Sequence, residues 1–163
     1  MNISDKICKY LSLGEVVRSE SAKRNNISNL PTPEHLENLK AVGENIFDKI
    51  REHFGCPIGI SSGYRSEELN KIIKGSSKTS QHCKGEALDI DADIHNKITN
   101  KDIFEFVKNN LDFDQMIWEY GTSQQPDWVH VSYKRNGGNR KSILRCKRVN
   151  GQPSYSKWDI SGI

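Results

Sequence analysis

Three polar side chains occupy strand-like or turn positions where a metal ligand could act. His82 lies just before a glycine turn, Asp89 lies on the segment that follows, and His130 lies on a second alternating segment. Two imidazoles and one carboxylate, with a fourth position left to water, form a common catalytic zinc site. Zinc lowers the pKa of bound water to ~7 and polarises a carbonyl, and both effects assist amide hydrolysis. From spacing alone, a metal site and a hydrogen-bonded His–Asp pair both remain open.

The alternation of apolar residues indicates where these side chains point. Leu88 and Ile90 alternate with Asp89, and two valines flank His130. Successive side chains on a strand point to opposite faces, so the apolar residues face the core. We therefore expect Asp89 and His130 to face a cleft on the other side of the sheet.

The remaining pattern predicts the elements that must position this cleft. Apolar residues at spacings of three and four, after a threonine cap and a proline, predict a long amphipathic helix. Helices are expected at residues 33–53, 67–74 and 99–110, and strands at residues 58–64, 86–91, 115–120, 128–133 and 142–146. This uneven segregation favours an α+β fold with a small, mostly antiparallel sheet flanked by helices. We expect a single catalytic domain at residues 1–146 and a polar C-terminal tail at 147–163.

Size and composition narrow the function classes. The chain has 163 residues, about one domain, and a net charge of +3, which argues against a polycationic nucleic-acid arm. No apolar run approaches the ~20 residues of a membrane span, and no secretory signal is recognisable at the start. The four cysteines form no CxxC pair, so a zinc ribbon is not expected. We expect a monomer that neither binds nucleic acid nor inserts into membranes.

One joined motif contains the three candidate ligands: Ser80-x-His82-x-x-Gly85-x-Ala87-x-Asp89, followed about 40 residues later by Trp128-x-His130. It resembles the zinc D-alanyl-D-alanine carboxypeptidases and phage L-alanyl-D-glutamate endopeptidases, in the superfamily that also holds the hedgehog fold. The similarity covers about residues 12–145 and is strongest to the phage-type branch. It implies a hedgehog/DD-peptidase-like fold in which His82, Asp89 and His130 bind Zn²⁺.

The same resemblance suggests residues that contact substrate. Arg65, in a Gly-Tyr-Arg-Ser motif, is implied to reach the site, where its guanidinium would bind a substrate carboxylate or a developing oxyanion. Ser80 and Gln81 either line the substrate groove or cap the loop before His82.

Two carboxylates are candidates for the general base that accepts the water proton. Several relatives carry glutamate three residues before the last histidine, where this chain has the shorter Asp127. Glu119 is the other candidate, because alternation along its strand directs it toward the cleft beside His130. We favour Glu119 and keep Asp127 open.

The resemblance implies a zinc-dependent peptidase that cuts peptidoglycan stem peptides, as a D,D-carboxypeptidase or an endopeptidase. The phage-type motifs suggest an endolysin of phage or prophage origin. Such an enzyme would stay in the host cytoplasm until its release to the cell wall, or would be associated with the virion. The alternative is a non-catalytic, zinc-stabilised module of the same fold that binds the cell wall or builds the virion.

Overall fold

A single sheet organises the computed structural model, which describes residues 1–73 and 76–159. Within these residues six strands lie in the order β1-β2-β4-β3-β5-β6. They are β1 (Gly59–Ser62), β2 (Ala87–Asp91), β3 (Gln115–Glu119), β4 (Trp128–Ser132), β5 (Ser142–Val149) and β6 (Gln152–Lys157). All neighbouring strands are antiparallel except β3 and β5, which are parallel. The predicted α+β fold with a mostly antiparallel sheet is confirmed.

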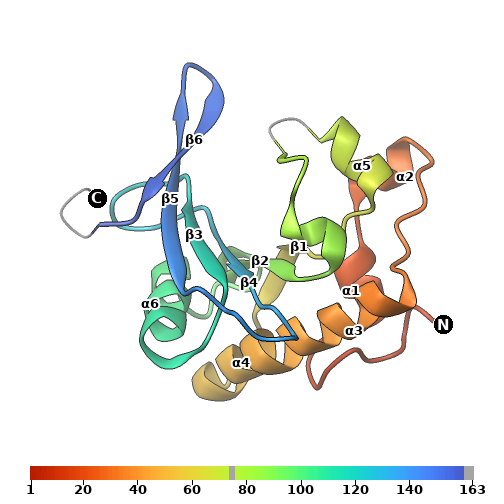
Figure 1. Cartoon of the computed structure of the whole chain (residues 1–163). Coiled ribbons are helices and arrows are strands. Elements are labelled where there is room, and N and C mark those ends of the chain that lie inside the picture. The colour runs from red at the N-terminus through yellow and green to blue at the C-terminus, as the bar shows by residue number, and fades with distance from the viewer. Residues whose placement is uncertain (74–75, 160–163) are drawn as a thin grey trace.

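Helical segments lie below and beside the sheet, and the β5–β6 hairpin projects away from them (Figure 1). They are α1 (Leu13–Val17), α2 (Glu20–Arg24), α3 (Pro33–Val42), the π-helical η1 (Gly43–Phe47), α4 (Asp48–Phe54), α5 (Glu67–Ile72), the 3-10 turns η2 (Gln81–Lys84) and η3 (Ala92–Ile94), and α6 (Asn100–Asn110). The long helix predicted at 33–53 is thus continuous through α3, η1 and α4, and Thr32 caps it as expected. The next helix, predicted at residues 67–74, ends at Ile72 in the structure, and residue 74 lies outside the described residues. No helix in the described part of the chain is long and apolar enough to cross a membrane.

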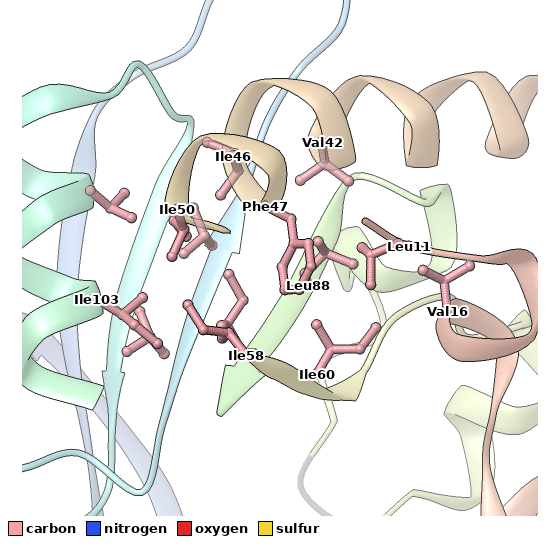
Figure 2. Packing of buried hydrophobic residues seen from close by; sticks show 14 of the residues in the cluster. Leu11, Val16, Val42, Ile46, Phe47, Ile50, Ile58, Ile60, Leu88 and Ile103 are labelled. Atoms are coloured by element: carbon pink, nitrogen blue, oxygen red, sulfur yellow. The ribbon is translucent and has the colours of Figure 1, made fainter. Parts of the chain in front are cut away.

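The hydrophobic core fills one face of the sheet. Phe47 from the long helix lies next to Leu88 of β2, and Ile50 and Ile103 of α6 belong to the same buried cluster (Figure 2). Each of these side chains is fully buried, which contributes roughly 1.5–3 kcal/mol per large apolar residue. The other face of the sheet carries the polar side chains Asp89, Glu119 and His130, together with the apolar Ile117 and Leu144.

The C-terminal segment differs from the expected tail. Residues 147–149 continue β5, and β6 pairs antiparallel with it to form a hairpin. Asn150 and Gly151, both with positive φ (51° and 76°), form the two-residue turn between the strands. An Asn-Gly pair favours this turn type, but β6 is an exposed edge strand whose polar residues give no apolar alternation. Residues 160–163 of the expected tail lie outside the described residues.

Candidate metal centre

Three buried side chains converge on the face of the sheet opposite the core. Asp89 and His130 are direct cross-strand partners on β2 and β4, and η2 brings His82 over them. Oδ1 of Asp89 lies 3.2 Å from Nε2 of His82 and 3.1 Å from Nδ1 of His130. One ligand atom from each residue lies within 4.8 Å of the other two. The structure thus brings the three predicted ligands together.

The hydrogen bonding of His82 fits a bound cation. Its Nδ1 lies 2.7 Å from the carbonyl oxygen of Gly63, which can only accept, so Nδ1 carries the proton in the neutral ring. Nε2 then points at the Asp89 carboxylate, and a proton or a metal ion between these two atoms satisfies both. The observed separations are close to the ~3.3 Å between ligands of a tetrahedral zinc ion with bonds of ~2.0–2.1 Å. The donor set therefore fits zinc, with Gly63 orienting one imidazole.

A helix cap and two glycines determine the position of His82. Ser80 caps η2 by accepting a hydrogen bond from the backbone N–H of His82. Gly85 follows in the left-handed region, with φ of 73°, and turns the chain into β2. Gly63 packs so closely that a Cβ there would lie 2.5 Å from the carbonyl oxygen of Val16. Glycine at this position therefore allows the segment whose carbonyl contacts the imidazole of His82 to pack closely against Val16.

The electrostatic environment keeps Asp89 ionised. Burial by itself would raise the pKa of this carboxyl, but the charges and hydrogen bonds of His82 and His130 hold its pKa well below the ordinary value. A permanently anionic carboxylate between two imidazoles is a suitable ligand for a divalent ion.

The two candidate bases lie in different surroundings. Glu119 is buried and lines the same cavity as the metal ligands, and burial raises its pKa to about 7 despite the opposing charge of His130. Asp127 is exposed and is not among the described residues that line the cavity. Its backbone N–H donates to the carbonyl of Glu119 at 2.8 Å. The structure therefore brings Glu119, and not Asp127, to the candidate centre.

A cavity of about 790 Å³ opens above the metal ligands, which is within the usual size range of ligand pockets. Its floor is the polar face of the sheet. One wall comes from the segment between α5 and η2, and the other from the β5–β6 hairpin. The wall residues include Ile73, Ser76, Ser77, Thr79, Ser80 and Gln81 on the first side, and Leu144, Arg148, Gly151, Gln152, Pro153 and Tyr155 on the second.

The predicted substrate contacts all line this cavity. The backbone N–H of Arg65 donates to the carbonyl of His82, and its guanidinium contacts Asn70 and Ser62. No carboxylate among the described residues forms an ion pair with Arg65. The side chain of Gln81 is already engaged, because its Nε2 donates a hydrogen bond to Asp114 at 2.9 Å.

Sequence patterns missed the aromatic part of the cavity. Tyr120 and Trp128 meet edge to face with ring centroids 5.4 Å apart, and Tyr155 lies on the hairpin. Trp128 belongs to the recognised Trp-x-His motif, but Tyr155 lies in the segment expected to be a tail.

Fold and site together define a metallopeptidase-type domain, with an α+β sheet that holds a buried His–Asp–His cluster beside a carboxylate. The family model described as Peptidase M15 matches residues 9–132. The chain therefore belongs to the peptidase M15 family. A comparison with curated proteins found no match.

Proposed function

We propose that this protein is a zinc-dependent peptidoglycan peptidase that hydrolyses amide bonds of stem peptides. The observation that carries the proposal is the convergence of His82, Asp89 and His130 in a cavity that also holds the buried Glu119. Membership of the peptidase M15 family supports a peptide substrate. The resemblance to phage-type enzymes supports an endolysin of phage or prophage origin, held in the host cytoplasm until release or carried by the virion.

Each residue would have a defined task. His82, Asp89 and His130 would hold the zinc ion, which supplies an acidified water and a polarised carbonyl when bound. Glu119 would accept the proton of the attacking water at its carboxylate and return it to the leaving amine. A buried carboxylate in the same cavity as the metal ligands is suited to both transfers.

Arg65 would hold the anionic part of the substrate. Its backbone is tied to His82, and its guanidinium lacks a carboxylate partner among the described residues. A cation so placed can pair with a substrate carboxylate or stabilise the developing oxyanion.

The decisive experiment is digestion of purified peptidoglycan by the zinc-loaded protein, with products identified by mass spectrometry. We expect new amine and carboxyl ends in the stem peptides, and their position separates carboxypeptidase from endopeptidase action. A chelator and His130→Ala should each abolish the products, whereas His95→Ala, at an exposed histidine outside the cavity, should not. Digestion that survives both the chelator and His130→Ala would refute the proposal. Zinc binding without any cleavage would instead favour the non-catalytic, wall-binding module.

A further inference from the structure

The β5–β6 hairpin forms one wall of the cavity yet lies entirely outside the segment that matches the peptidase family. That segment ends at residue 132, whereas the hairpin spans residues 142–157. In Figure 1 the hairpin projects at the top of the view and faces the side on which α5 lies. The hairpin therefore adds a surface to the site that the matched part of the chain does not provide.

The hairpin is fixed relative to the candidate base. β5 pairs parallel with β3 so that Cys146 lies beside Glu119, and β6 places Tyr155 on the other side of Cys146. Cys146 is fully buried, so the base of the hairpin is packed tightly against β3. A side chain on this wall consequently has a defined position with respect to Glu119.

Arg148 is the cation of this wall. It lines the cavity, and its guanidinium carbon lies 4.6 Å from the ring centroid of Tyr120, the residue next to Glu119. Tyr120 is in turn held against Trp128. The stacking preorganises the guanidinium. No ion pair to Arg148 occurs among residues 1–73 and 76–159, so its charge is available to a ligand.

The arginines of the cavity are not equivalent. Arg140 is occupied, because its Nε and one terminal nitrogen donate to the two oxygens of Asp114 at 3.0 and 2.9 Å. Arg65 follows β1 at one edge of the sheet, and Arg148 lies on β5 toward the other edge. The metal-binding strands β2 and β4 lie between β1 and β5. Arg65 and Arg148, neither of which forms an ion pair with a described residue, therefore line the cavity from the two sides of the metal-binding strands.

We propose that the hairpin is a specificity element in which Arg148 binds a free carboxylate of the substrate, across the cleaved bond from Arg65. This inference rests on the proposed function. It narrows the substrate to a peptide with carboxylates on both sides of the bond that is cut. Stem peptides meet this condition for the bonds that lie between the γ-linked D-glutamate, which has a free α-carboxyl, and the carboxyl at the C-terminus.

The test compares Arg148→Gln with Lys147→Gln, since Lys147 is the adjacent cation on β5 but does not line the cavity. The substrate is a synthetic L-Ala-γ-D-Glu-L-Lys-D-Ala-D-Ala peptide in three forms: unmodified, amidated at the D-glutamate α-carboxyl, or amidated at the C-terminus. Steady-state kinetics of the zinc-loaded proteins and calorimetric binding of the same peptides to the metal-free proteins provide two separate readouts. Circular dichroism verifies that both variants fold.

Loss of one charge-assisted contact predicts a 10- to 100-fold fall in kcat/KM for the unmodified peptide with Arg148→Gln, mainly through KM. One of the amidated peptides should be nearly insensitive to this change, because it lacks the carboxylate that Arg148 binds. The affinity of Arg148→Gln for the unmodified peptide should fall in parallel. Arg148→Lys should retain part of both kcat/KM and peptide affinity, and Lys147→Gln should change each of these by less than about twofold.

The outcomes separate this inference from the proposed function. If the wild-type protein cleaves none of the peptides and no peptidoglycan, both are refuted. If it cleaves them but Arg148→Gln behaves like Lys147→Gln, only the role of Arg148 is refuted. An equal loss for all three peptides would also refute that role, because the effect would not depend on a carboxylate.

Discussion

Replacing Glu119 by glutamine removes a buried charge without changing the shape of the side chain, and it should affect stability and activity in opposite directions. Burial raises the pKa of Glu119 from 4.5 to about 7. A shift of about 2.5 pH units, at 1.36 kcal/mol per unit, corresponds to about 3 kcal/mol. This is the free energy by which ionised Glu119 disfavours the folded, metal-free protein.

The sign follows from proton binding. Between pH 4.5 and 7 the native state keeps the Glu119 proton while the unfolded state releases it, so stability falls as the pH rises through this window. The full destabilisation is present above pH 7 and absent below pH 4.5. In the presence of a chelator at pH 8, the free energy of unfolding of Glu119→Gln, measured by urea titration, should therefore exceed that of the wild type by about 3 kcal/mol. Near pH 4 the two free energies of unfolding should be equal. The zinc-loaded variant should lose about 10²- to 10⁴-fold in kcat, the usual contribution of a general base.

Asp127→Asn is the matched control. Its side chain is exposed and outside the cavity, so we expect a stability change within about 0.5 kcal/mol at both pH values and little loss of activity. If the stability difference between Glu119→Gln and wild type is the same at pH 4 and pH 8, the assigned environment of Glu119 is wrong. If Asp127→Asn abolishes cleavage and Glu119→Gln does not, Asp127 is the base.

Three further predictions concern the supports of the site. Asp89→Asn removes the anionic ligand, so zinc affinity measured by competition with a chromophoric chelator should fall by at least tenfold; unchanged affinity would place the metal elsewhere. Burial opposes ionisation of Asp114, but its hydrogen bonds from Arg140 lower its pKa from 3.8 to about 2. Ionised Asp114 should therefore stabilise the folded protein by about 2 kcal/mol above pH 4, and this stabilisation should be lost as the pH falls toward 2. Urea titrations of Asp114→Asn and wild type should accordingly differ at pH 7 and converge near pH 2. Gly63→Ala forces a Cβ against the Val16 carbonyl, so it should lower the free energy of unfolding by about 1–3 kcal/mol and should also weaken zinc binding. Gly137→Ala, where a Cβ meets nothing within 4 Å, should leave zinc affinity unchanged.

The positions of the metal ligands could be predicted because short-range signals determine them. Alternation places Asp89 and His130 on one face of their strands, and the glycine turn at Gly85 returns His82 to the same face. The cross-strand register that makes Asp89 and His130 direct partners is a long-range property. Alternation fixes the face of each side chain but not which residue lies opposite it, so the sequence predicts a shared face and leaves the 3.1 Å contact to the structure.

The hairpin wall was not predictable by the same means. Its second strand has polar residues on both faces because it is an exposed edge of the sheet, and periodicity detects a strand only when one face is buried. The Asn150–Gly151 pair was a local signal for a two-residue turn. The Asn-Gly pair therefore indicates a hairpin in a segment whose hydropathy pattern indicates no strand. This hairpin is the element that brings Arg148 and Tyr155 to the cavity.

The location of the two candidate bases follows from strand parity. Asp127 lies three residues before His130, so on an extended chain the two side chains point to opposite faces. Glu119 is the cross-strand partner of Trp128, which has the same parity as His130, and directly opposed residues project to the same face. The resemblance to relatives with glutamate three residues before the last histidine kept Asp127 open, whereas strand alternation favoured Glu119, and pairing across the sheet supports Glu119. The β3–β4 register is the physical reason why Glu119, eleven positions from His130, lines the cavity while Asp127 remains in solvent.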